Sequence, residues 1–337
     1  MTGLWGILAA VVCCSLVGSI AAEAQAATKI PLVTDLITVS AVEGPRGDYE
    51  SIKRIERIDA QGVHIVYTTE RHKKPVLRTV RREDQASARH YLLRFAANYP
   101  EVVPNSTGIG TSRLVYTELK TKGQSDFSCC FLFTVDGQQL EGTIRRVGTA
   151  TVPIAVMVNN QRVMLPTIHA TGRMGTQKSN FYFLDDSENP LALKWEVGRQ
   201  RLQVIKISFP TKVAAARIET ALAKTGRAEV YGIYFDFASA TIKPESEPVL
   251  KEIADALTKN AKWKLNVEGH TDNVGGDAPN LDLSRRRAAA VKDALVSRYR
   301  ISAARLATSG FGASRPKETN ETLEGRARNR RVELATQ

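Results

Sequence analysis

The hydrophobic periodicity of this chain changes near residue 213, and this change constrains the fold more than any other feature of the sequence. Upstream, apolar and polar residues alternate in several segments, a spacing typical of half-buried β-strands. Downstream, short apolar runs alternate with amphipathic segments of helical spacing. We therefore divide the chain into a β-rich module (27–212), a helical linker (213–226) and a second domain (227–337). A length of 337 residues agrees with two domains of about 150 residues each.

The N-terminal segment has the features of an export signal. No charged residue occurs from Gly3 to Ala22, and small residues then alternate from Ala22 to Ala26, a pattern that signal peptidase accepts. We predict that residues 1–26 are a cleaved signal peptide. A retained membrane anchor is the alternative, because an apolar run of 20 residues is long enough to cross a bilayer. In both cases the rest of the chain is exported into an oxidising compartment.

Cysteine spacing indicates neither a disulfide framework nor a metal site. Cys13 and Cys14 lie inside the predicted signal peptide and lack the small preceding residue that lipid attachment requires. Cys129 and Cys130 are adjacent, with Cα atoms about 3.8 Å apart, below the usual disulfide range. A strained vicinal disulfide therefore competes with a strand over residues 128–135 in which Cys129 is a small core residue. The histidines upstream of the linker are scattered singly, so we expect no metal and no cofactor: His64, His72, His90 and His169.

The β-rich module contains several short candidate strands. They cover residues 52–58, 62–67, 152–158, 162–165, 181–184, 191–195 and 203–209. Two asparagines at residues 159–160 indicate a hairpin turn. One helix is expected over about residues 82–98, where Tyr91, Leu92 and Phe95 fall on one side. Because the strands are short and rich in Lys and Arg, and aromatic residues make up only 7% of the chain, we expect a soluble domain.

No catalytic site is visible in this module. Asp185 and Asp186 are adjacent carboxylates, but the Ser, Glu, Asn and Pro that follow them are typical of a solvated turn. No nucleophile or base accompanies them, so we expect no enzyme activity. The net charge of +12 is spread over both halves of the chain, which suits an anionic polymer or surface as partner. No basic run is interleaved with aromatic residues, which argues against nucleic acid.

The C-terminal third predicts alternating strands and helices. Strands are expected at residues 229–237, 264–269, 305–312 and 331–334, and helices from Pro244 and over about 280–298. A β-α-β-α-β-β order within about 110 residues predicts an α/β two-layer sandwich. The expected fold class is therefore this sandwich, preceded by a β-rich soluble domain.

Two charged residues of the second domain suit an amino-acid head group. Arg287 is the one of three consecutive arginines that lies nearest the apolar stripe of the long helix, so packing partly holds its guanidinium group. Asp272 follows the second strand, at a carboxyl end where α/β folds tend to bind ligands. The carboxylate of Asp272 can accept from an ammonium group while Arg287 binds a carboxylate. Together they suit a zwitterion.

The motifs around these residues resemble those of the OmpA-like peptidoglycan-binding domain. They include Gly269-His270-Thr271-Asp272, Leu283-Ser284 with Arg287-Ala288, Gly310-Phe311-Gly312 and the basic run from Gly325 to Arg331. The resemblance covers residues 230–336 and implies that Asp272 and Arg287 hold the diaminopimelate residue of the peptidoglycan stem peptide. It also implies flanking contacts from Asp236, Thr271, Asn280, Leu283 and Arg331. Residues 237–239 depart from the more polar turn of many members.

We expect a non-enzymatic protein that anchors non-covalently to peptidoglycan in the periplasm of a Gram-negative bacterium, associated with the outer membrane. Residues 27–212 would then contact an outer-membrane or other envelope protein. Two alternatives stay open: a stator-like or transporter-linked membrane component with a periplasmic peptidoglycan-binding tail, and an envelope enzyme with its site in residues 27–212. We interpret His270 as a scaffold residue, because no motif places a nucleophile beside it.

Overall fold

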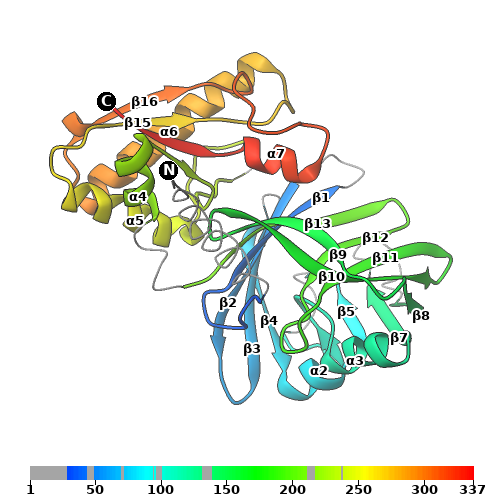
Figure 1. Cartoon of the computed structure of the whole chain (residues 1–337). Helices are drawn as coiled ribbons and strands as arrows, with labels where there is room; N and C mark the ends of the chain where they lie inside the picture. Colours follow the sequence, from blue (N-terminus) through cyan, green and yellow to red (C-terminus); the bar gives the residue numbers. More distant parts are fainter. Residues whose placement is uncertain are drawn as a thin grey trace, which may run out of the picture.

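The computed structural model describes residues 29–43, 49–69, 72–93, 95, 101–130, 139–210, 217–236 and 238–337. It arranges them in two sheets, an N-terminal one (blue to green in Figure 1) and a C-terminal one (yellow to red). The predicted signal peptide, with Cys13 and Cys14, lies outside the described residues. Residues 131–135 of the strand expected around Cys129 lie outside them too.

The N-terminal part is mostly β-structure, and its described residues form one thirteen-stranded sheet. The strands are β1 (Ile37–Glu43), β2 (Tyr49–Ile58), β3 (Gly62–Thr69), β4 (His72–Arg81), β5 (His90–Leu92), β6 (Ser106–Thr107), β7 (Gln124–Cys130), β8 (Gln139–Arg146), β9 (Val152–Val158), β10 (Gln161–Met174), β11 (Gln177–Leu184), β12 (Ala192–Val197) and β13 (Gln200–Ser208). Two short helices, α2 (Arg82–Ser87) and α3 (Arg113–Thr121), lie at the end far from the C-terminal part (Figure 1). The expected β-rich character of this region is confirmed.

Strand β9 closes part of this sheet into a ring. It pairs antiparallel with β10 and, through Met157 and Val158, parallel with β13. Because β10, β11, β12 and β13 pair in sequence, the five strands from β9 to β13 form a closed, barrel-like ring. Aliphatic and aromatic side chains share the main core of the N-terminal part, where Phe127 packs edge-on against Phe181 and Phe183.

The predicted hairpin at residues 159–160 is confirmed. Strands β9 and β10 pair antiparallel on either side of it. Asn159 and Asn160 have φ angles of 45° and 65°, the left-handed conformation that a two-residue hairpin turn requires and that asparagine tolerates.

The helix predicted over residues 82–98 is wrong beyond Ser87. Helix α2 ends there, and Tyr91 and Leu92 lie in β5, which pairs in parallel with β6 and with β7. A short apolar run satisfies a buried strand as well as one face of a helix. The strand partner at residues 128–130, nearly 40 positions away along the chain, decides between them.

The C-terminal part is a four-stranded sheet with helices packed on one face (Figure 1). Its elements are α4 (Arg217–Thr225), β14 (Arg227–Val230), the single-turn helix η2 (Pro244–Ser246), α5 (Glu247–Lys259), β15 (Leu265–Gly269), α6 (Asp277–Tyr299), the single-turn helix η3 (Ala303–Arg305), β16 (Leu306–Gly310), α7 (Leu323–Asn329) and β17 (Val332–Thr336). The strand order is β14-β17-β15-β16. Strands β15 and β16 are parallel, and β17 is antiparallel to both its neighbours.

The first strand of this sheet is shorter than predicted. Strand β14 ends at Val230, whereas the apolar run continues to Phe235. Beyond β14 the chain turns toward η2: the amide of Tyr234 donates to the Ser246 hydroxyl at 2.8 Å, and Phe235 makes an isolated bridge with Ile242. The apolar residues after Val230 therefore do not extend the sheet: Ile233 packs in the core of the C-terminal part, and Tyr234 packs against side chains of the N-terminal sheet.

Two helices differ in role from the expectation. Helix α4, expected as a linker, places Ile218 and Leu222 in the core of the C-terminal part, and Gly226 ends it with φ 70°. Helix α7 was not predicted, and Thr322 caps it by accepting from the Gly325 amide at 3.0 Å. In the part of the chain that the structure describes, no helix is long and apolar enough to cross a membrane.

An apolar cluster joins the two parts. It combines side chains from β1, β2 and β13 with side chains from the C-terminal part: Ile37, Val39, Ala41, Ile52 and Ile205 against Tyr234, Leu323 and Ala327. Helix α7 lies against β1 and β13 at this junction (Figure 1). At its edge, Arg162 pairs with Glu324 at 2.8 Å, and the Thr68 hydroxyl donates to Glu245 at 3.2 Å.

Lys53 is a buried base in the N-terminal part. Its side chain is on β2, and the residue is only 8% exposed. The ammonium group donates to the Gly108 carbonyl at 2.6 Å and lies 4.8 Å from the centre of the Phe95 ring. Burial lowers the pKa of Lys53 from 10.5 to about 7.

We predict that Lys53→Met removes a pH dependence of stability. Between the two pKa values, Lys53 holds a proton in the unfolded chain but not in the folded chain. The unfolding free energy of the wild type is therefore highest above pH 10.5 as far as Lys53 is concerned, and this contribution falls as the pH falls to about 7. Between pH 7 and pH 9, the unfolding free energy of the wild type should rise about 2 kcal/mol more than that of Lys53→Met. Urea unfolding of both proteins measures this difference, and an equal change in both would contradict it.

Candidate functional site

Asp272 lies in the loop that follows β15, and the fold buries its carboxylate. The residue is 8% exposed. One carboxylate oxygen accepts from the Val274 amide at 3.0 Å, which holds the loop in a tight turn. The other oxygen pairs with the Arg330 guanidinium group, with Nη1 at 2.5 Å. The carboxylate is therefore oriented and already paired with a cation.

Two of the predicted flanking residues hold the backbone of this loop. The side-chain amide of Asn280, in the first turn of α6, donates to the carbonyls of Asp272 at 3.1 Å and Val274 at 3.0 Å. The Thr271 hydroxyl donates to the Asp272 carbonyl at 2.8 Å. Asn280 and Thr271 are both buried, and their hydrogen bonds to the loop carbonyls hold the backbone of Asp272 in place. Leu283 is half-buried on α6.

Arg287 projects from α6 toward the segment after β14. Its Nε donates to the Ser239 carbonyl at 3.0 Å and Nη2 to the Asp236 carbonyl at 3.5 Å, while the guanidinium carbon lies 4.7 Å from the centre of the Phe235 ring. Backbone acceptors and an aromatic face thus orient the guanidinium group. The carboxylate of Asp236 pairs instead with Lys243 at 2.8 Å.

Arg330 and Glu50 belong to the same site, and sequence reasoning missed both. Arg330 donates through Nε to Glu50 at 2.8 Å, Nη2 contacts the same carboxylate oxygen, and Nη1 pairs with Asp272. The predicted neighbour, Arg331, pairs with Glu333 at 2.6 Å. Arg330 stood in the basic run before the last strand, so a signal for it existed. Nothing in the local sequence marks Glu50.

A small cavity of about 30 Å³ lies between these charged groups. Its lining includes the predicted residues Arg287 and Arg331 together with Arg330, Glu50 and Lys206. Burial alone would raise the pKa of Glu50, but Arg330, Lys206 and Arg287 lower it to about 2. The structure therefore brings two predicted residues, Asp272 and Arg287, to one charged region, with Arg330 between Asp272 and the cavity. Arg331 also lines the cavity, but its guanidinium group pairs with Glu333.

The comparison with known proteins identifies this region. The OmpA family model matches residues 234–330. Residues 234–330 are an OmpA-family domain. Outer membrane porin F of Pseudomonas aeruginosa is 46% identical over 101 residues, which are 30% of this chain and 29% of the porin. Peptidoglycan-binding protein ArfA of Mycobacterium tuberculosis is 38% identical over 102 residues, 30% of this chain and 31% of that protein.

The likeness is confined to this domain. The chain covers less than a third of the length of the first relatives, which are outer membrane proteins of Pseudomonas aeruginosa and Acinetobacter baumannii. Among solved structures, the cell wall anchor of the T6SS from Pseudomonas aeruginosa is 33% identical, over 36% of this chain and 95% of that chain, with a TM-score of 0.30. A location at the envelope of a Gram-negative bacterium agrees with the relatives.

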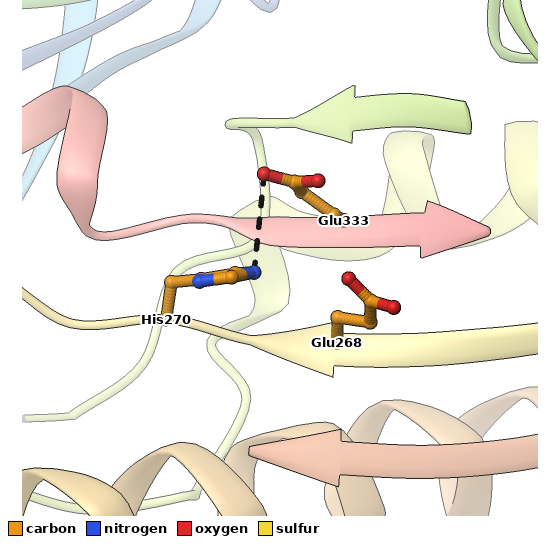
Figure 2. Close-up of side chains that lie close together, drawn as sticks. All are labelled: Glu268, His270 and Glu333. Atoms are coloured by element: carbon orange, nitrogen blue, oxygen red, sulfur yellow. Dashed lines mark ion pairs between the residues drawn. The ribbon is translucent and has the colours of Figure 1, made fainter. Parts of the chain in front are cut away.

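A second charged cluster lies on the sheet face of the OmpA-family domain that is turned away from the helices. Figure 2 shows Glu268 and His270, from β15 and the residue after it, beside Glu333 of β17. The His270 ring lies 3.9 Å from Glu333, and the ligand atoms of all three side chains lie within 4.8 Å of one another. Burial, and then Arg331, lowers the pKa of His270 to about 4, so the imidazole is neutral at pH 7.

Arginines already occupy the carboxylates of this cluster. Arg227 bridges Glu268 at 2.5 Å and Glu333 at 2.7 Å, and Arg331 pairs with Glu333. These arginines lower the pKa of Glu333 to about 2 against the effect of burial. A divalent cation would have to displace both guanidinium groups, so the donor set suits an ion-pair network and we assign no metal to it.

We predict that Asn280→Ala destabilises the domain. The substitution leaves two loop carbonyls without their side-chain donor, which should lower the unfolding free energy by about 1–3 kcal/mol in urea titrations. Asp282→Ala on the same helix is the matched control, because that carboxylate is 65% exposed and pairs with the exposed Arg286. Equal destabilisation by the two substitutions would show that Asn280 does not hold the loop.

Proposed function

We propose that this protein is a non-enzymatic envelope protein that binds peptidoglycan non-covalently through its OmpA-family domain. The observation that carries the proposal is the convergence of Asp272, Arg287 and Arg330 on one small charged region after β15. The names of relatives support it, since one is a peptidoglycan-binding protein and others are outer membrane porins. The relatives are structural proteins of the envelope, which agrees with a binding role.

The ligand of this site is the diaminopimelate residue of the stem peptide. Its free amino-acid end carries an ammonium group and a carboxylate, and the site offers an acceptor and a donor of matching charge. Asp272 accepts from the ammonium group, and Arg287 binds the carboxylate through its planar guanidinium group. Thr271 and Asn280 hold the loop, while Asp236, Leu283 and Arg331 complete the surroundings of the ligand.

The rest of the chain positions this domain in the envelope. Residues 1–26 act as a signal peptide, and the mature protein lies in the periplasm, associated with the outer membrane and the cell wall. The N-terminal part, residues 27–212, contacts an outer-membrane or other envelope protein. The surplus of basic residues favours retention near anionic surfaces.

The first test compares two neighbouring arginines on α6. Arg287 faces the site, whereas Arg286 is half exposed and pairs with Asp282 at 2.8 Å. We expect Arg287→Ala and Asp272→Asn each to lower retention of the purified chain on peptidoglycan sacculi by about tenfold or more, because each removes a charge-assisted hydrogen bond. Arg286→Ala removes the same charge and should be retained as the wild type is. Retention that falls equally in both arginine variants would mean non-specific charge attraction.

The second test addresses the chemistry of the ligand. Sacculi whose stem peptides contain lysine in place of diaminopimelate keep the ammonium group but lack the carboxylate that Arg287 would bind. We expect the half-saturating protein concentration to be about 10- to 100-fold higher on these lysine-type sacculi than on diaminopimelate-type sacculi. The same half-saturating concentration on both kinds of sacculi would contradict recognition of diaminopimelate.

A further inference from the structure

The N-terminal sheet reaches into the site of the OmpA-family domain. Glu50 is the second residue of β2, Lys206 lies in β13, and both line the same cavity as Arg287 and Arg330. Glu50 is separated from Arg330 by 280 positions in the chain, yet its side chain is only 13% exposed and pairs with Arg330. A carboxylate of the chain itself thus lies among the cations of the proposed binding site.

We propose that Glu50 acts as an internal ligand, which keeps the site closed to peptidoglycan until the N-terminal sheet moves away. This inference rests on the proposed function. The Glu50 carboxylate takes the place of the ligand carboxylate beside the arginines, and Arg330 takes the place of the ligand ammonium group on Asp272. Binding of diaminopimelate therefore competes with an intramolecular ion-pair chain from Asp272 through Arg330 to Glu50.

The charges of the closed site are satisfied without a ligand. Arg330 lies between two carboxylates, and Lys206 and Arg287 add positive potential around Glu50. Both carboxylates of this network are already paired with Arg330, so a ligand gains contacts there only by exchanging partners. A ligand must replace Glu50 at the arginines and Arg330 at Asp272, so opening and binding are coupled.

The Glu50 carboxylate also occupies the place beside the arginines that a ligand carboxylate would need. Glu50, Arg287 and Arg330 line one small cavity of about 30 Å³. Arg330 separates this cavity from Asp272, with which it pairs. The apolar cluster that includes Ile52, Tyr234 and Ala327 holds the sheet over the site, together with the ion pair between Arg162 and Glu324.

The test measures binding of the full exported chain to diaminopimelate-type sacculi as a function of protein concentration. Glu50→Gln keeps the shape of the side chain and removes its charge. Glu56→Gln on the same strand is the matched control, because this carboxylate is 40% exposed and pairs with Arg54 at 3.8 Å, away from Arg330. Ile52→Asp is a second way to open the junction, since Ile52 packs in the joining cluster and not in the main N-terminal core.

We expect Glu50→Gln and Ile52→Asp to lower the half-saturating concentration about tenfold or more, because apparent affinity scales with the fraction of open molecules. Glu56→Gln should bind as the wild type does. The double variant Glu50→Gln, Arg287→Ala should lose this increase in affinity, which would show that the increase arises at the site that contains Arg287.

Two results would overturn the inference and leave the proposed function standing. In the first, the wild type binds sacculi as well as Glu50→Gln and Ile52→Asp do, while Arg287→Ala does not bind. This result would mean that the junction does not limit access to the site. Glu50→Gln could bind more weakly than the wild type, which would mean that Glu50 orients Arg330 for the ligand. If none of these proteins is retained, the proposed function itself fails, and the inference fails with it.

Discussion

The register of β17 is the constraint on which the rest of the C-terminal part depends. This last strand lies inside the sheet, where it pairs Val332 with Gly269 of β15. The pairing continues one step further, from the His270 amide to the Arg331 carbonyl at 3.1 Å. Arg330 therefore arrives beside the loop that carries Asp272. A slip of one residue would turn Glu333 into the helix-packed core and Leu334 out of it.

The same register separates two networks of charge. Along β17, Glu333 faces away from the helices and joins Glu268, Arg227 and Arg331 in one network. Arg330, just before the strand, joins Asp272 and Glu50 in the other. Removal of one partner from such a buried network leaves an uncompensated charge, so both networks restrict the strand to a single pairing. The first network joins β14, β15 and β17, and the second contains residues of the proposed binding site.

Local patterns predicted much of the C-terminal domain. The apolar stripe of α6 placed Arg287 at the margin of the core, and the strand before Asp272 placed that residue at a carboxyl end of the sheet. The N-terminal part was harder, because β-pairing joins residues far apart in the chain. Tyr91 and Leu92 show this: their spacing fits a helix, but a parallel partner in β7 makes them a strand. The short helix α7 was missed because seven residues carry too little periodicity.

By itself, the sequence determined the types of most elements and the OmpA-family motifs. It also predicted the export signal at the N-terminus and the two residues, Asp272 and Arg287, on which the proposed function rests. Each of these follows from short runs of neighbouring residues, which local patterns reveal. Only the tertiary structure decided that Arg330, not Arg331, pairs with Asp272, because strand register aligns the two loops. Only the tertiary structure brought Glu50 to the same site, because packing of the two parts joins residues that lie 280 positions apart.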